Sequence, residues 1–289
     1  SESRLFQPFR AVGLVADDVP FILTTLGGKN FITTCIGKAF QIYDADHLVL
    51  ANLSAPGSHR ISCLETHRDL TFAGVGHDIH VYKRARMTSA LRGHRGAVRF
   101  LMRMGDVLLS LGDDRALGVW NSATESLVKM IELPPTLTPT CWVHPATYVN
   151  KVVIGGQEGV LQLWNFRTGK LIHEFQSWAG VPITALAPAP AIDVVAIGLA
   201  DGRIVVHNLR VDETIMTFRQ TDGAVTWLSF RTDPPSSSTK GAAASTDMLA
   251  SGSTSGQVHV WELNERRLHH TMTDAHDARV VKVQWLARQ

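Results

Sequence analysis

The chain has 289 residues, a formal net charge of +2, 45% hydrophobic and 19% charged residues, and a mean hydropathy of +0.03. This composition is typical of a globular protein with a sizeable core. No apolar run approaches the roughly 18 to 20 residues that span a bilayer. The opening SESRLFQPFR lacks the basic end and apolar core of a signal peptide. We therefore expect a soluble intracellular protein with no membrane partner.

Neither the cysteines nor the histidine pair predicts a metal site. Cys35, Cys63 and Cys141 are too few and too scattered for a disulfide framework or a zinc site, so we expect buried, reduced thiols. His77 and His80 flank a turn and a strand start, with no further ligand at a supporting spacing. The sequences GxxxxGK[ST], GxGxxG, HExxH and GxSxG do not occur. We therefore predict no catalytic residue, cofactor, metal or small-molecule substrate.

In chain order, six short strands of alternating character each follow a turn and end in an aromatic residue or a histidine. They recur at about 40 to 45 residues, the length of a WD-type repeat with four strands per unit. Long helical periodicity is absent. The pattern predicts an all-β, WD40-type β-propeller with six recognisable four-stranded blades and an incomplete seventh. The six strands end at Tyr43, Tyr82, Trp120, Trp164, His207 and Trp261.

We expect one WD-repeat β-propeller over residues 1–289. Thr232 to Thr246 form a Pro/Ser-rich insertion that lengthens the sixth repeat. Residues 10–15 are predicted to form a closing strand, and residues 279–286 the innermost strand of a seventh blade. Because the middle strands of that blade are missing, the chain is expected to be a fragment of a longer protein. The blades are expected near residues 17–54, 59–92, 93–133, 137–176, 181–219 and 223–273, with a partial blade at 275–289.

The third repeat, Gly93 to Asn121, holds a histidine, a serine, an aspartate and a tryptophan. A catalytic triad needs an exposed serine with an oxyanion hole beside it. In a propeller blade, His94 instead links Asp114 in the turn to Ser110 on the next strand, and the indole of Trp120 completes the network. We therefore predict a structural network. At the turn position the other repeats carry Gly37, Gly76, Glu158, Asp201 and Ser255, and none has the whole set.

Several turns between third and fourth strands are rich in Lys and Arg. These residues are candidates for contacts with a protein partner or with RNA phosphates. The same turns carry Asp and Glu, which favours a mixed solvated surface, and no interleaved aromatic residues predict base stacking. The candidates are Lys83, Arg84, Arg86, Arg167, Lys170, Arg210, Arg266 and Arg267, together with Arg103 between a first and a second strand.

Three segments carry a resemblance beyond the general repeat. They are ITTCIGKAFQIYD (32–44), HPATYVNKVVIGGQEGVLQLWN (144–165) and APAIDVVAIGLADGRIVVHNLRVDETIMTFRQ (189–220). They closely resemble the "U three protein twenty-one" family, the nucleolar tandem WD-repeat subunits of the small-subunit processome. The segments are specific because they include departures from the repeat consensus, such as His207 in place of tryptophan.

This resemblance implies a non-catalytic scaffold in pre-rRNA processing, 18S rRNA maturation and small ribosomal subunit biogenesis, located in the nucleolus. It also implies partners: the other tandem WD-repeat subunits of the same subcomplex, and pre-ribosomal RNA and small nucleolar RNA within the particle. Family members carry a second propeller and a C-terminal helical region, which lie outside this sequence. The insertion at 232–246 is longer than the family leads us to expect.

The alternative is a substrate receptor or adaptor of a ubiquitin ligase. Such receptors often present Trp-Asp-x-Arg after the third strand of a blade, and Trp164-Asn165-Phe166-Arg167 comes close. Asparagine in place of aspartate removes the charge, so the sequence favours the scaffold. An enzyme ranks third, because propeller enzymes gather ionisable groups at the central channel and the sequence indicates no convergent set.

Overall fold

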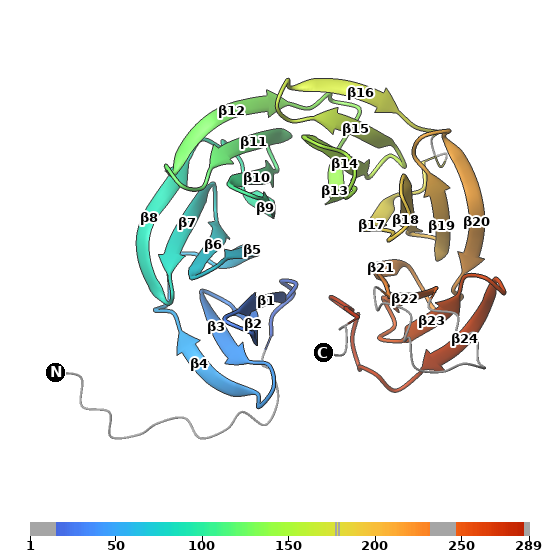
Figure 1. The fold of residues 1–289 in the computed structure, drawn as a ribbon, viewed down its shortest axis with the longest axis horizontal. Coiled ribbons are helices and arrows are strands. Elements are labelled where there is room, and N and C mark those ends of the chain that lie inside the picture. The colour runs from blue at the N-terminus through green and yellow to red at the C-terminus, as the bar shows by residue number, and fades with distance from the viewer. Residues whose placement is uncertain (1–15, 177, 179, 232–246, 286–289) are drawn as a thin grey trace. The chain divides into compact units, whose positions relative to one another are not determined.

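A computed structural model describes residues 16–176, 178, 180–231 and 247–285 of the chain (Figure 1). The predicted closing strand at 10–15 and the insertion at 232–246 lie outside the described residues. The described residues form six four-stranded sheets in which consecutive strands pair antiparallel. None of the described segments forms an apolar helix of membrane-spanning length.

The described part of the first compact unit, Ser1–Leu133, contains three of these sheets, or blades. Within each blade the chain runs from the first strand to the fourth without a crossover, because each connection is a short turn. The strands are β1 (Ile22–Leu26), β2 (Lys29–Ile36), β3 (Ala39–Asp44), β4 (Val49–Leu53), β5 (Ile61–His67), β6 (Leu70–Val75), β7 (Asp78–Lys83), β8 (Arg86–Arg92), β9 (Val98–Met104), β10 (Val107–Gly112), β11 (Ala116–Asn121) and β12 (Ser126–Glu132).

The second compact unit, Pro134–Gln289, repeats this arrangement in the other three blades. The insertion at 232–246 lies between the first and second strands of its last blade. The strands are β13 (Pro139–Val143), β14 (Lys151–Gly156), β15 (Leu161–Asn165), β16 (Lys170–Glu174), β17 (Ile183–Pro188), β18 (Val194–Leu199), β19 (Arg203–Asn208), β20 (Glu213–Arg219), β21 (Val225–Phe230), β22 (Met248–Ser253), β23 (Val258–Glu262) and β24 (Arg267–Met272).

The core of each unit lies between neighbouring blades. Second and third strands are near-continuous apolar runs because both of their faces are covered, as in β10 (VLLSLG) and β11 (ALGVWN). Fourth strands lie outermost, and β16 (KLIHE) is exposed along its whole length. In the first unit, Phe72 and Ile79 of one blade pack in the same cluster as Leu101, Leu108 and Trp120 of the next. Stacking therefore buries faces that no single sheet covers alone.

All six blades share an irregularity at the position where the sequence repeats an aromatic residue or a histidine. The register between the third and fourth strands shifts at that residue, as at Val119/Trp120 in the third blade. A β-bulge of this kind re-aims the side chain and increases the local twist. The shifts in the other blades fall at Ile42/Tyr43, Val81/Tyr82, Leu163/Trp164, Val206/His207 and Val260/Trp261.

The segment after the sixth blade differs from the predicted strand at 279–286. Residues 279–285 are not assigned to a strand: their backbone bonds the sixth blade through the Val280 N–H to the Ser253 carbonyl, but they form no ladder with a described strand. Val280 is nevertheless buried and fills the space beside Gly252, just as Val225 fills the space beside Gly198. The segment thus occupies the place of a first strand beside the sixth blade, and a seventh blade stays a prediction.

Candidate functional site

The structure brings His94, Ser110, Asp114 and Trp120 together in the third blade. Trp120 Nε1 donates to Ser110 Oγ at 2.8 Å, and Ser110 Oγ lies 2.6 Å from His94 Nε2. On the other side of the ring, His94 Nδ1 lies 3.0 Å from Asp114 Oδ1. If the imidazole proton is on Nδ1, every group is satisfied in one direction: indole to hydroxyl, hydroxyl to imidazole, imidazole to carboxylate.

This network is closed to solvent at its serine. Ser110 is 0% exposed and Trp120 is 1% exposed, whereas a nucleophilic serine must face its substrate. Burial opposes the ionisation of Asp114, but the Arg95 N–H, at 2.7 Å, and the His94 ring hold the pKa of that carboxyl below its ordinary value. The arrangement ties the turn, the second strand and the third strand of the blade to one another.

The sixth blade carries a related network that the sequence analysis missed. Trp261 Nε1 donates to Ser251 Oγ at 2.9 Å, and Ser251 Oγ donates to Gln220 Oε1 at 3.0 Å. Gln220 thus takes the place of His94, with an amide oxygen in place of an imidazole nitrogen. In both blades the serine and the tryptophan are 10 residues apart. His94 and Ser110 are 16 residues apart in the third blade. Gln220 and Ser251 are 31 residues apart in the sixth blade, because the insertion at 232–246 lies between them in the sequence.

His207 occupies the position of the fifth blade that holds an aromatic residue in the other blades. Its side chain contacts a carboxylate and two aromatic rings, and not a serine as Trp120 and Trp261 do. Its Nε2 lies 3.1 Å from Asp212 Oδ1, and the other oxygen of Asp212 lies 3.1 Å from His173 Nε2. The rings of Phe175 and Trp178 pack edge-on against His207, with centroids at 5.8 and 5.7 Å. Burial lowers the pKa of His207 despite the opposing charge of Asp212, so the buried ring favours its neutral form.

The three cysteines and the pair His77 and His80 form no common site. Cys35 and Cys63 are buried as expected, whereas Cys141 is half-buried. Burial raises the pKa of Cys35 to about 11 and that of Cys63 to about 12. Burial also lowers the pKa of His80, and His77 lies beside a carboxylate of its own turn. Within the described part of the chain, no three His, Cys, Asp or Glu side chains are arranged so that they could hold a metal ion.

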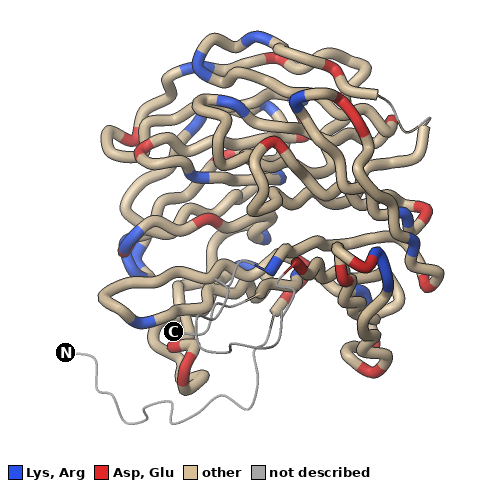
Figure 2. Tube along the Cα trace, turned by 45° about the vertical axis from the view of Figure 1, so that its right-hand side comes forward, with Lys and Arg blue, Asp and Glu red and all other residues tan. Residues whose placement is uncertain are grey.

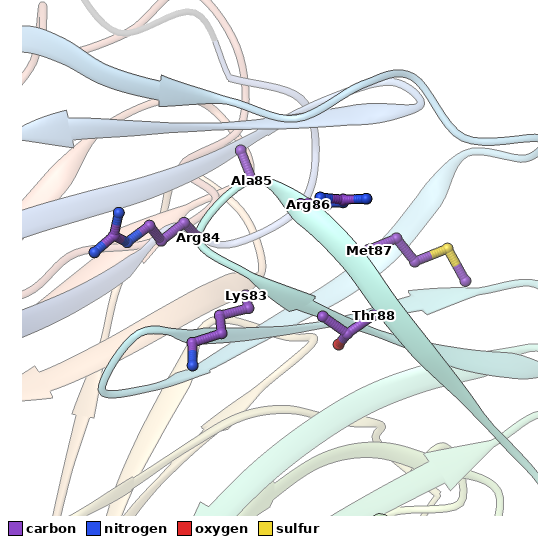
Figure 3. Close-up of a pocket in the computed structure, with 6 residues that line it drawn as sticks. All are labelled: Lys83, Arg84, Ala85, Arg86, Met87 and Thr88. Carbon is purple, nitrogen blue, oxygen red and sulfur yellow. The ribbon is translucent and has the colours of Figure 1, made fainter.

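The basic candidates of the first unit lie mostly on the hairpin between β7 and β8 (Figure 3). Lys83 Nζ lies 3.6 Å from Asp69 Oδ2, and the Arg84 N–H donates to the Asp69 carbonyl at 2.8 Å. Residues 83–88 line a surface hollow in which the side chains of Arg84 and Arg86 point to opposite sides. The hairpin therefore presents separated charges rather than a convergent pocket.

The basic candidates of the second unit lie on three corresponding hairpins. Arg167 and Lys170 flank the turn from β15 to β16, Arg210 lies in the turn from β19 to β20, and all three are exposed. Arg267 forms ion pairs with Glu262 at 2.9 Å and with Glu265 at 2.5 Å, whereas no carboxylate among the described residues pairs with its neighbour Arg266. Figure 2 shows acidic and basic residues interspersed along the chain, as expected for a mixed surface.

Asn165, which stands where ubiquitin-ligase receptors often have aspartate, stabilises its own turn. Its Oδ1 accepts the N–H groups of Arg167 and Thr168, both at 3.0 Å. Asn121 and Asn208 form the same kind of turn after the third strands of their blades. The side chain of Asn165 is therefore part of a repeated turn, and this position gives no support of its own to a receptor function.

Six four-stranded blades with bulged, buried third-strand aromatics define a WD-repeat β-propeller protein. A family model described as the WDR36/Utp21 first beta-propeller matches residues 32–289, and the chain belongs to this family. The chain is 34% identical to "WD repeat-containing protein 36" of Homo sapiens over 291 residues, which cover 99% of this chain and 31% of that protein. It is 35% identical to the "U3 small nucleolar RNA-associated protein 21 homolog" of Schizosaccharomyces pombe over 296 residues, covering 100% of this chain and 31% of that protein.

The chain thus spans about a third of the length of these relatives. Among solved structures, a chain in "Crystal Structure of Mitotic Checkpoint Complex" is similar in fold, with a TM-score of 0.76. The match covers 96% of this chain and 84% of that one at 16% sequence identity, so it bears on the fold alone.

Proposed function

We propose that this chain is the first propeller of a non-catalytic scaffold subunit of the small-subunit processome. It acts in pre-rRNA processing, 18S rRNA maturation and small ribosomal subunit biogenesis in the nucleolus. The observation that carries the proposal is the family match over residues 32–289, together with similarity along the whole chain to a relative whose name associates it with U3 small nucleolar RNA. Family membership and that name together point to ribosome biogenesis.

Two features of the described residues support a scaffold. The third-blade residues that resemble a catalytic triad form a buried network around Ser110, which is 0% exposed. The turns and fourth strands, in contrast, carry exposed and varied side chains, as protein-binding surfaces do. In the proposed role, the buried network holds the blade while the exposed hairpins contact the other tandem WD-repeat subunits and RNA of the particle.

The basic hairpin between β7 and β8 is the sharpest candidate for such a contact. Arg84 and Arg86 are exposed, and no carboxylate among the described residues pairs with either. Replacing both with glutamate should weaken incorporation of the full-length protein into the particle, because phosphates or acidic partners would then meet like charge. The double substitution Lys29→Glu and Lys38→Glu, at two other exposed sites in the same unit, is the matched control. Incorporation equal to that of the control would remove this hairpin as a contact.

Affinity purification of the full-length protein tests the proposal directly. The expected co-purifying molecules are other tandem WD-repeat proteins and the small nucleolar RNA, measured by mass spectrometry and RNA sequencing. A ubiquitin-ligase adaptor in their place would favour the alternative function and reject the scaffold.

A further inference from the structure

The hairpin between β7 and β8 carries a pattern of residue types in addition to its charge. Residues 84–89 read RARMTS, with Arg84 five residues and Arg86 three residues before Ser89. Protein kinases that prefer basic substrates recognise arginines at these two spacings through carboxylates of their own. Arg84 and Arg86 are the only two arginines of the sequence that are separated by a single residue, so no other serine or threonine has an arginine at both spacings.

Both arginines are accessible to a partner. Arg84 and Arg86 are exposed, and no carboxylate among the described residues pairs with either. Their side chains lie beside an open hollow of about 900 Å³ that residues 83–88 line (Figure 3). A kinase therefore reaches each guanidinium without displacing an ion pair of this chain.

Arg86 and Ser89 lie on one extended strand, the conformation in which kinases bind their substrates. β8 is the outermost strand of its blade and pairs with β7 alone, so one side of its backbone has no neighbouring strand in the sheet. The ladder with β7 is interrupted directly before Ser89, because Val81 pairs with Ser89 and Tyr82 with Met87. Thr88 is the extra residue of this bulge. The strand is thus joined to its blade least regularly at the place where the kinase must engage it.

The hydroxyl of Ser89 is held at the surface by the neighbouring blade. Ser89 Oγ donates to Glu125 Oε2, in the turn between β11 and β12. Ser89 is half-buried and Glu125 is exposed, so a swing of the carboxylate into solvent releases the hydroxyl. Thr88 is exposed, but its Oγ1 donates to the Val81 carbonyl at 3.1 Å, and no arginine lies three or five residues before it. Ser89 is the hydroxyl that the spacing selects.

We propose that Ser89 is a phosphorylation site for a protein kinase that recognises arginines before its acceptor. Ser89 Oγ attacks the γ-phosphorus of ATP, and the O–P bond forms as the bond to the bridging oxygen breaks. ADP leaves with that electron pair, and the serine proton passes to the catalytic base of the kinase. The proposal goes beyond the role in ribosome assembly and does not depend on it.

The phosphate changes the contact between the second and third blades. It carries about −1.5 to −2 charges at pH 7 and lies where Ser89 now donates to the carboxylate of Glu125. A hydrogen bond is thereby replaced by repulsion between like charges. Phosphorylation therefore loosens the outermost strand of the second blade from the turn of the third.

Phosphate transfer from ATP by a purified arginine-directed serine/threonine kinase tests the site, in the full-length protein and in a synthetic peptide of residues 82–92. Tandem mass spectrometry should locate the phosphate on Ser89 in both. Arg86→Gln should lower the rate at Ser89 about tenfold, as expected when one charge-assisted contact of about 1.4 kcal/mol is lost. Arg84→Gln should lower it less, because Arg84 lies in the turn, with a φ of 58°, and not on the extended strand. Arg95→Gln, at another exposed site of the unit, is the control and should leave the rate unchanged.

Four results overturn the proposal. They are a peptide that the kinase does not modify, a full-length protein whose Ser89 stays unmodified when the peptide is modified fully, phosphate on Thr88 in place of Ser89, and a rate at Ser89 that Arg86→Gln leaves unchanged.

Hydrogen exchange tests the effect of the phosphate. Phosphorylation should speed exchange in residues 86–92 and 122–126 more than Ser89→Ala does, because the variant loses the hydrogen bond without adding charge. Glu125→Gln should reduce this difference, since it removes the like charge. Equal exchange in the phosphorylated protein and in Ser89→Ala would overturn the repulsion from Glu125.

Discussion

Ser110 is the residue on which the third-blade network converges, because both the Trp120 indole and the His94 imidazole bond to its hydroxyl. Ser110→Ala leaves both rings buried and without that partner, so we expect the free energy of unfolding to fall by about 2 to 3 kcal/mol. Urea denaturation measures the loss. Ser251→Ala should have a similar effect in the sixth blade, where Ser251 joins Trp261 to its own partner.

Ser126→Ala provides the comparison, since Ser126 is exposed and its loss should change stability by no more than about 0.5 kcal/mol. An effect of Ser110→Ala as small as this one would show that the network contributes little to the stability of the blade.

His207 gives the fold a defined dependence on pH. Burial lowers the pKa of this imidazole in the folded state, so the unfolded chain takes up the proton first as the pH falls. The contribution of His207 is therefore full above its ordinary pKa of about 6.5 and is lost below that value. Asp212, whose own pKa is lowered despite its burial, keeps its charge in this range.

We expect His207→Gln to reduce the drop in melting temperature between pH 7.5 and pH 5.5, because the variant has no buried imidazole there to protonate. His67 and His80, whose pKa values are also lowered mainly by burial, should leave a residual drop in the variant. An identical drop in both proteins would contradict the burial argument for His207.

The residue types of the repeat predicted the hydrogen-bond network of the third blade but not that of the sixth blade. His94, Ser110 and Trp120 were found because they keep the residue types of the repeat. Gln220 was missed because an amide replaces the histidine and because the insertion at 232–246 shifts its spacing to Ser251. Removing the insertion from the count would have aligned the two networks. Most of the basic candidates lie at the expected hairpins, but Arg103 lies within β9 and not between strands, and their role as contacts stays a prediction. The sequence contains no signal for how each side chain points.

At the scale of elements, the repeated third strands were predictable because both of their faces are covered and the strands are consequently apolar. The bulge at each aromatic position was not predictable, since it depends on how two strands pair and not on either strand alone. The strand predicted at 279–286 differs from the structure for the same reason, because strand pairing cannot be inferred from one segment alone. The alternation of RVVKVQWL indicates a half-buried segment, and Val280 is indeed buried, but a strand also requires a ladder of backbone hydrogen bonds to its neighbour.

Val280 should be the anchor of that segment. Its N–H donates to the Ser253 carbonyl at 3.0 Å, and its side chain packs beside Gly252. Val280→Ala should cost about 1 to 3 kcal/mol and speed hydrogen exchange in peptides covering residues 279–285. Val211→Ala is the control, since Val211 is 58% exposed. Exchange in residues 279–285 that is unaffected by Val280→Ala would show that the contact with the sixth blade does not hold the segment.

At the scale of the whole molecule, the repeat predicts the fold, and the matches along nearly the whole chain show the family. The sequence resemblance was argued from departures from the repeat such as His207, which contacts Asp212, and Asp212 in turn contacts His173. The chain spans 31% of the length of two relatives that it matches.

Depletion of the full-length protein, followed by quantification of mature ribosomal RNAs, tests the proposed function most directly. We expect 18S rRNA to fall, with early pre-rRNA intermediates accumulating and large-subunit rRNA largely unchanged, and an intact copy of the protein to restore the 18S level. Normal early cleavage with an unchanged 18S level, or an equal fall in the rRNAs of both subunits, would contradict the account.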